Sequence, residues 1–157
     1  SCTGKKSAET DVLHADRHFT FPPGFPPDPG EPGKKTIEGI DSDKDGLRDD
    51  LQRWIYARFP NDEPRRKALR QLAIAFQKDI QTTIDANNWK MIRETSDRAN
   101  DCLDLFFPGD VNGLVQMEYV RAKVFNTEGR TRQYLKNDAF FDGMVLELKI
   151  YEAPCDK

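Results

Sequence analysis

The sequence has little of several residue types and patterns that would mark out a function. Only two histidines and three cysteines occur among its 157 residues. Uncharged apolar stretches are far shorter than the ~20 residues needed to cross a bilayer, so we expect no transmembrane helix. Lys and Arg total 24 against 27 for Asp and Glu, a formal net charge of −3. Without a basic excess, the chain has no general attraction for nucleic acid or for anionic membrane surfaces.

The cysteines do not follow a zinc-site pattern, because no two of them show CxxC spacing and no histidine lies near any of them. We expect Cys102 and Cys155 to form a disulfide, which would close a loop of about 53 residues and hold the C-terminus in place. The alternative is a pair of reduced cysteines in a cytosolic protein. The disulfide interpretation favours an oxidising compartment, here the periplasm or the cell surface.

The third cysteine, Cys2, follows Ser1 and precedes a polar and then proline-rich stretch. This arrangement resembles the mature start of a bacterial lipoprotein, in which a small residue precedes the cysteine that receives the lipid. The resemblance implies lipidation at Cys2 and therefore a membrane anchor without a membrane-spanning segment. The alternative is an unmodified, exposed cysteine on an N-terminal tail.

Residues 1–36 show no periodic apolar pattern, and the stretch 19–33 holds six of the ten prolines. Proline fixes φ and removes amide donors, so this segment is expected to be irregular or extended. Two interpretations remain open: a spacer that tethers the domain to a membrane anchor, or a peptide that docks in an aromatic-lined partner groove. In either case Phe19, Phe21 and Phe25 could fold back onto the domain.

Residues 37–157 are expected to form a single, mainly α-helical domain, a compact bundle of about five helices. Apolar residues recur there at steps of three and four, which is the helical period, and the runs are separated by Pro, Gly and Asn breaks. One such stripe lies in the second run: Leu69, Leu72, Ala73, Phe76, Ile80 and Ile84. The expected helices span about 46–59, 64 to the break at 87–88, 89–106, 111–125 and 130–139.

The C-terminal segment 144–151 alternates apolar and charged residues, which is the period of a strand. A single strand needs a partner for its backbone groups. This segment is therefore expected to be a strand-like or extended arm on the helices, with a last helix as the alternative.

Residues 41–52 carry the one motif with specific chemistry. Asp41, Asp43 and Asp45 occupy alternate positions, and Gly46 follows them. Alternate carboxylates before a glycine allow the chain to turn sharply around a hard cation that prefers oxygen ligands.

This segment resembles the EF-hand-like calcium loops, especially the single Asp-rich loops of extracellular bacterial proteins and thrombospondin-type repeats. The resemblance covers residues 41–52 only, and Gln52 stands where EF-hands place a bidentate glutamate. Because glutamine offers one neutral oxygen, we expect weak binding, which still suffices at extracellular calcium concentrations. The alternative is an acidic turn that caps the following helix. The implied calcium ligands are Asp41, Asp43, Asp45, Leu47 (through its carbonyl), Asp49 and Gln52.

No sequence pattern of a catalytic class is visible: there is no G-x-S-x-G, no glycine-rich phosphate loop and no Cys–His pairing. We therefore expect a calcium-stabilised, non-catalytic envelope domain that either binds another envelope protein or acts as a structural lipoprotein. The alternative function is a small envelope hydrolase with a carboxylate pair that the sequence does not single out. A single acidic loop, without a second one, favours a structural calcium site over a sensor.

Overall fold

The computed structural model describes residues 11–109 and 111–157 of the chain. Within these residues the protein is mainly helical and contains no β-strand. This confirms the predicted helical bundle. The elements are the 3₁₀ segment η1 (Glu31–Lys34), the helices α2 (Asp49–Arg58), α3 (Glu63–Gln81), α4 (Trp89–Phe106), α5 (Asn112–Val124) and α6 (Glu128–Asp138), and the 3₁₀ segment η2 (Ala139–Phe141).

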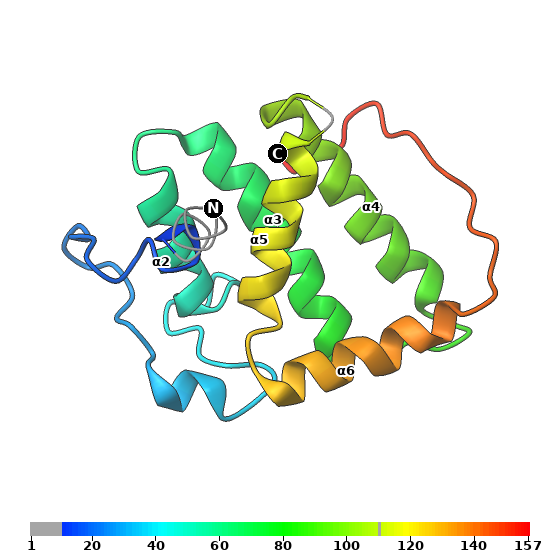
Figure 1. The fold of residues 1–157 in the computed structure, drawn as a ribbon, viewed down its shortest axis with the longest axis horizontal. Coiled ribbons are helices and arrows are strands. Elements are labelled where there is room, and N and C mark those ends of the chain that lie inside the picture. Colours follow the sequence, from blue (N-terminus) through cyan, green and yellow to red (C-terminus); the bar gives the residue numbers. More distant parts are fainter. Residues whose placement is uncertain (1–10, 110) are drawn as a thin grey trace, which may run out of the picture.

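Helix α3 is the centre of the bundle. It packs against α4 and α5 along its length and also contacts α2 and α6. Figure 1 shows α3, α4 and α5 running alongside one another, with α6 crossing at one end of them. The part of the chain before α2 lies on one side of this bundle, and the segment after η2 returns along the outer side of α4.

The ends of α3 follow from local chemistry. Asp62 is its N-cap, and the Asp62 carboxylate accepts a hydrogen bond from the Arg65 amide. The helix ends at Gln81, three residues before the predicted stripe finishes at Ile84. Asn137 of α6 explains this end, because its side chain accepts a hydrogen bond from the Ile84 amide (3.2 Å) and donates one to the Thr82 carbonyl (2.8 Å). A side chain distant in sequence thus replaces the next helical turn.

The helical periodicity identified the core correctly for most positions. All six residues of the predicted α3 stripe are buried, including Ile84 beyond the end of the helix. In α5, Val120 and Val124 are fully buried, whereas Leu114 on the same predicted face is 56% exposed. Periodicity reports which residues share a face, but whether a neighbouring helix covers that face is decided in three dimensions.

The proline-rich segment lies on the helical body instead of extending away from it, at least over residues 11–36. The Trp54 indole donates a hydrogen bond to the Val12 carbonyl (2.9 Å), and Arg53 donates one to the Pro26 carbonyl (2.9 Å). The Phe25 ring lies 4.9 Å from that of Tyr56. Phe19, Phe21 and Phe25 all lie against Tyr56, so the aromatic side chains fold back onto the domain and help to hold residues 11–36 in place. Residues 1–10, with Cys2, lie outside the described residues.

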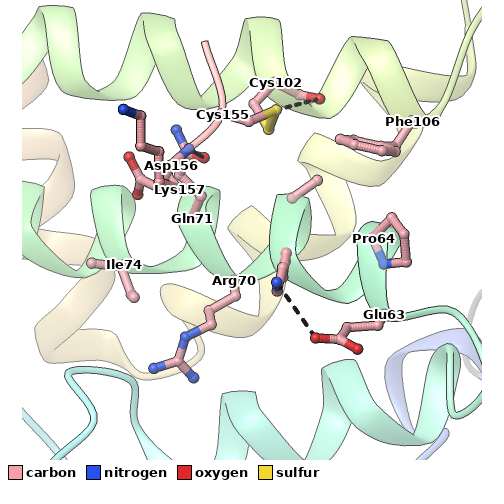
Figure 2. Close-up of a pocket in the computed structure, with 12 residues that line it drawn as sticks. Glu63, Pro64, Arg70, Gln71, Ile74, Cys102, Phe106, Cys155, Asp156 and Lys157 are labelled. Carbon is pink, nitrogen blue, oxygen red and sulfur yellow. Dashed lines mark hydrogen bonds and ion pairs between the residues drawn. A yellow bond between two sulfur atoms is a disulfide. The ribbon is translucent and has the colours of Figure 1, made fainter. Parts of the chain in front are cut away.

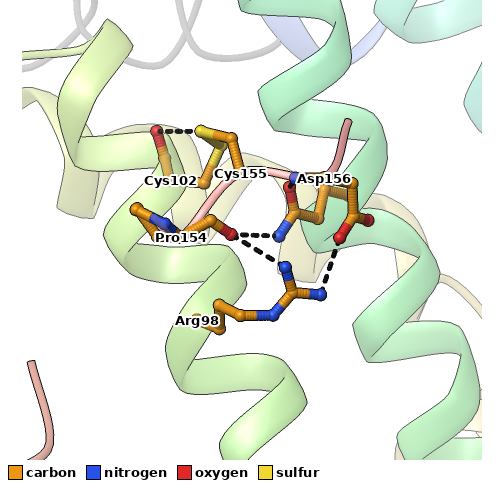
Figure 3. Close-up of a disulfide and its surroundings, with 6 residues drawn as sticks. Arg98, Cys102, Pro154, Cys155 and Asp156 are labelled. Atoms are coloured by element: carbon orange, nitrogen blue, oxygen red, sulfur yellow. Dashed lines mark hydrogen bonds and ion pairs between the residues drawn. A yellow bond between two sulfur atoms is a disulfide. The ribbon is translucent and has the colours of Figure 1, made fainter. Parts of the chain in front are cut away.

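The expected disulfide between Cys102 and Cys155 is present, with 4.9 Å between the two Cα atoms. Figure 3 shows how polar contacts reinforce it: Arg98 donates to the Pro154 carbonyl (3.1 Å) and pairs with Asp156 (2.6 Å). Gln71 of α3 also donates to the Pro154 carbonyl (2.8 Å) and accepts from the Asp156 amide (2.9 Å). The C-terminus is therefore fixed to α3 and α4 together.

The segment between η2 and this C-terminal attachment is extended. It is an arm, as expected from its alternating pattern, and neither a paired strand nor a helix.

None of the helices within residues 11–109 and 111–157 combines the length and apolar character that crossing a bilayer requires.

Candidate metal centre

The predicted calcium loop forms a tight turn directly before α2. Lys44 (φ 58°) and Gly46 (φ 89°) both adopt left-handed backbone conformations, which glycine accepts without strain. The Asp41 carboxylate closes the turn by accepting hydrogen bonds from the Asp45 amide (3.2 Å) and the Gly46 amide (2.9 Å). No incoming helix precedes the loop, since residues 35–40 are irregular, so the unit is a loop followed by one helix.

Three of the predicted ligands come together in space. Asp41 and Asp43 from the loop and Asp49 from the first turn of α2 each place a carboxylate oxygen within 4.8 Å of the other two. Like charges at this distance repel one another, so a cation among them is stabilising. The arrangement agrees with the role that the motif predicted for these three residues.

Asp49 gives the cluster its distinctive character, because its side chain is only 1% exposed. One carboxylate oxygen accepts a hydrogen bond from the Ser42 amide (3.0 Å). The other oxygen is buried and has no hydrogen-bond partner among the described residues. A buried carboxylate oxygen without a donor is costly unless a cation or water satisfies it.

Gln52 lies beside the same cluster and shows the same feature. Its amide group donates to a carboxylate oxygen of Asp43 (3.1 Å), while its own amide oxygen is buried and unpartnered in the described structure. Two oxygens, one from Asp49 and one from Gln52, thus remain available in the region where the motif expects ligands.

Asp45 is placed differently from the other predicted ligands. One of its carboxylate oxygens accepts from the Leu47 amide (2.9 Å), and the other pairs with the Arg70 guanidinium of α3 (2.8 Å). Arg70 also donates to the Asp45 carbonyl (2.8 Å). Asp45 therefore lies outside the group of three carboxylates, and a positive charge from α3 offsets its negative charge.

The alternative interpretation of the loop as an acidic helix cap stays open, because Asp49 and Asp50 lie in the first turn of α2, where the helix dipole favours carboxylates. The N-cap of α2 is Arg48, which makes no side-chain cap. The loop carboxylates accept hydrogen bonds from amides within the loop, as Asp41 and Asp45 do, or from Ser42 in the case of Asp49. The predicted ligand Leu47 buries its side chain in the core, and its carbonyl accepts no hydrogen bond from the described residues.

Arg48, next to the loop, connects it to the rest of the bundle. Its guanidinium is buried and donates to the carbonyls of Val124 (2.9 Å) and Lys123 (3.0 Å), at the C-terminal end of α5. It also forms a two-point ion pair with Asp50 (2.9 Å for each contact). Burial alone would raise the pKa of the Asp50 carboxyl, but the hydrogen bond and charge of Arg48 hold it below its usual value.

A second buried guanidinium, that of Arg130 in α6, holds the segment that enters the loop. It donates to the carbonyls of Gly33 (2.7 Å), Thr36 (3.0 Å) and Ile37 (3.2 Å). Gly39 passes so close that a Cβ atom there would lie 2.8 Å from the Arg130 guanidinium, and its φ is 68°. The sequence analysis missed this role, since an arginine on a helix is ordinarily solvated and no local pattern distinguishes a buried one.

One groove lies away from the carboxylate cluster, beside the disulfide. It has a volume of about 540 Å³. Figure 2 shows Phe106 and the cysteines on the α4 side facing residues of α3. The carboxylates at its rim are engaged in ion pairs: Glu63 with Lys67 (3.4 Å) and Asp156 with Arg98. The groove therefore has an apolar floor and a charged rim.

A smaller cavity of about 260 Å³ lies among α3, α4, α5 and α6. Asp79, Asn100 and Arg121 line it, and each has one buried side-chain atom without a hydrogen-bond partner among the described residues. Burial raises the pKa of Asp79 to about 7, and a hydrogen bond from Ser96 and the charge of Arg93 offset this only in part. Asp79 is consequently the described carboxyl whose protonation changes near neutral pH.

This shift predicts a pH dependence of stability that Asp79→Asn should remove. Between about pH 4 and pH 7 the native protein retains a proton on Asp79 that the unfolded chain has released. The free energy of unfolding should therefore fall as pH rises through this window. At pH 8 the Asp79→Asn variant should be more stable than the parent by about 1–3 kcal/mol.

Urea denaturation at pH 5 and pH 8 measures this effect. Asp142→Asn, which changes an exposed carboxyl, is the matched control and should leave the pH dependence unaltered. Equal stabilities of Asp79→Asn and the parent at pH 8 would show that the Asp79 carboxyl is not destabilised by its surroundings.

Comparison of the chain with protein-family models, curated proteins and solved structures gave no match. The function must therefore be inferred from the chemistry of the sites themselves.

Proposed function

We propose that this protein is a calcium-stabilised, non-catalytic domain of the cell envelope, which binds another envelope protein or serves as a structural lipoprotein. The observation that carries the calcium part is the convergence of Asp41, Asp43 and Asp49, of which Asp49 has a buried and unpartnered oxygen. Three carboxylates with no neutralising cation would be an unfavourable arrangement.

The donor set favours calcium among the biological cations. All the candidate ligands are oxygens, from carboxylates, a Gln52 amide and the Leu47 carbonyl, and there is no nitrogen or sulfur donor in the group. Such hard oxygen ligands suit Ca²⁺ or Mg²⁺ better than zinc. An irregular ligand shell suits Ca²⁺ better than Mg²⁺, which demands near-ideal octahedral geometry.

The position of the cluster indicates what the ion would do. It joins the loop to the first turn of α2, next to Arg48, which in turn contacts the end of α5. A cation there would hold together three parts of the fold: the entering segment, α2 and, through Arg48, α5. A structural role follows, in which calcium increases the stability of the folded state.

The envelope location is supported by the Cys102–Cys155 disulfide, since such bonds persist in oxidising compartments. Calcium outside the cytoplasm is abundant enough to fill a site with dissociation constants of about 10⁻⁴–10⁻³ M. Lipidation at Cys2 remains a prediction from the sequence. Mass spectrometry of the protein isolated from membranes tests it.

The binding role is supported by the groove beside the disulfide. An apolar floor with charged residues at the rim is the usual anatomy of a protein-binding surface. The lining includes the apolar residues Ala68, Ile74 and Phe106 and the basic residues Lys67 and Lys157. A segment of a partner protein with apolar anchors and acidic flanks would fit these features.

Thermal melts with calcium, magnesium and chelator test the calcium proposal. Calcium at ten times its dissociation constant should raise the free energy of unfolding by about 1.4 kcal/mol, and magnesium should raise it much less. Asp49→Asn and Asp41→Asn should each abolish the calcium-dependent increase. Gln52→Glu should strengthen calcium binding, because it supplies a bidentate carboxylate.

Asp142→Asn is again the matched control, since this exposed aspartate lies far from the loop in sequence, and it should retain the full calcium response. Identical melts of the parent protein in calcium and in chelator would reject the calcium proposal. An equal response to calcium in the parent and in Asp49→Asn would place the ion elsewhere.

A further inference from the structure

The C-terminal arm exposes several large apolar side chains almost completely. Val145 is 100% exposed, Leu148 94% and Ile150 92%. These three side chains lie within six residues of one another, with Glu147 and Lys149 between them, so one short segment concentrates exposed apolar surface. Exposed apolar stretches of this kind mark interaction sites in folded proteins.

Between its two ends, the backbone amides and carbonyls of the arm are also without hydrogen-bonded backbone partners in the described part of the chain. Residues 145–150 take part in no backbone hydrogen bond within the described part of the chain. The arm is nevertheless held at both ends: the Met144 amide donates to the Phe141 carbonyl (3.0 Å), and the Tyr151 amide donates to Asp101 (3.3 Å). An extended segment fixed at both ends, with free amides and carbonyls, is ready to pair with another strand.

The sequence of the arm indicates that its partner strand is the same arm of a second copy, because the charges and apolar residues of two antiparallel arms match. In an antiparallel pair of two arms with Leu148 opposite Leu148, each Glu147 lies opposite Lys149 of the other copy. On the neighbouring positions, Leu146 lies opposite Ile150. Opposite charges and apolar pairs directly across two strands are stabilising.

Other registers lose this agreement. A shift that places Glu147 opposite Glu147, or Lys149 opposite Lys149, brings like charges together, which is destabilising. A shift that pairs Glu147 with Leu148 mixes apolar and charged residues on both faces of the ribbon. The charge pattern therefore selects one register and an identical partner.

The ion pair that Lys149 makes in the single chain does not prevent this pairing. Its ammonium group lies 2.8 Å from Glu94, but both side chains are largely exposed. Exposed pairs of this kind contribute little, so Lys149 can turn toward Glu147 of a second copy. Figure 1 shows the arm on the outer side of α4, where a second copy can approach it.

We propose that two copies of this protein associate through their C-terminal arms, which pair as antiparallel strands centred on Leu148. The association depends on residues 144–151 and is independent of the calcium loop. Because a two-stranded ribbon is only marginally stable by itself, the dimer is expected to be in exchange with the monomer.

Cysteine cross-linking tests the register directly, in a Cys2→Ser background that removes the third cysteine. In the proposed dimer the two Leu148 Cα atoms lie about 4.5–5.5 Å apart, within the range of a disulfide. Leu148→Cys should therefore form a covalent dimer under mild oxidation. Val145→Cys is the matched control, because its two copies would lie about 20 Å apart along the ribbon and should remain uncross-linked. Equal cross-linking of both variants, or of neither, would overturn the proposal.

Analytical ultracentrifugation tests the association without added cysteines. The parent protein should approach twice the 18.0 kDa of one chain as its concentration rises. Leu148→Glu should raise the dissociation constant at least about tenfold, because two carboxylates would meet at the centre of the ribbon. Leu135→Glu changes an exposed leucine of α6 (58% exposed) and should leave the association unchanged.

Charge reversal distinguishes register-specific strand pairing from nonspecific hydrophobic association of the arm. Glu147→Lys should weaken the dimer, and addition of Lys149→Glu in the same chain should restore it, since the double variant rebuilds the opposite-charge pairs. A parent protein that stays monomeric up to about 1 mM would overturn the proposal. A Glu147→Lys/Lys149→Glu double variant that dimerises no more tightly than Glu147→Lys alone would also overturn it.

Discussion

Loss of the Cys102–Cys155 disulfide is expected to lower the free energy of unfolding by about 2–4 kcal/mol. The bond closes a loop across a sequence separation of 53 residues, so it restricts the unfolded chain substantially. It also holds Pro154 and Asp156 against Gln71 and Arg98. Urea denaturation of the Cys102→Ala/Cys155→Ala double variant measures the loss.

The remaining cysteine provides the control for this experiment. Cys2→Ser should unfold at the same urea concentration as the parent, and a reductant should destabilise both to the same extent. If the parent and the double variant had equal stability, the contacts of Pro154 and Asp156 would suffice to hold the C-terminus without the covalent bond.

Arg130→Met is expected to destabilise the protein by about 3–5 kcal/mol. The side chain is fully buried and donates to the Gly33, Thr36 and Ile37 carbonyls. Methionine retains much of the volume but leaves these buried acceptors without donors, and each costs free energy. The segment that leads into the Asp-rich loop should then loosen.

Limited proteolysis together with denaturation measures this outcome. The Arg130→Met variant should be cleaved after Lys34 or Lys35 more readily than the parent. Arg132→Met is the matched control, because Arg132 lies two residues away in the same helix but is exposed and, among the described residues, pairs with Glu128 alone. Similar losses in both variants would contradict a special role for the buried guanidinium.

Both predictions concern contacts that connect distant parts of the chain, and the cluster of Asp41, Asp43 and Asp49 depends on such contacts as well. Arg48 and Arg130 hold the regions on either side of residues 41–47, while Asp49 belongs to α2. The loop motif supplies the carboxylates, but the burial of Asp49 comes from the surrounding structure. Under the proposed calcium role, loss of either arginine should therefore also weaken calcium binding.

The helical body could be predicted from the sequence because its determinants are local. The three- and four-residue spacing of apolar side chains, the Asp62 cap and the breaks at proline and asparagine act within a few residues of one another. For the same reason the Asp-rich loop could be recognised, since alternate carboxylates followed by a glycine define the turn by themselves. The sequence also predicted the pairing of Cys102 with Cys155.

Tertiary structure alone decided the features that depend on residues far apart. Asp45 faces Arg70 of α3 and not the other three carboxylates, Asn137 of α6 ends α3, and the proline-rich segment lies on α2. None of these outcomes has a local signal, because a charged or polar side chain looks the same in sequence whether it faces water or a partner. Packing decides which of these groups meet. Once packing excludes water, each buried polar atom needs a hydrogen-bond partner from the protein.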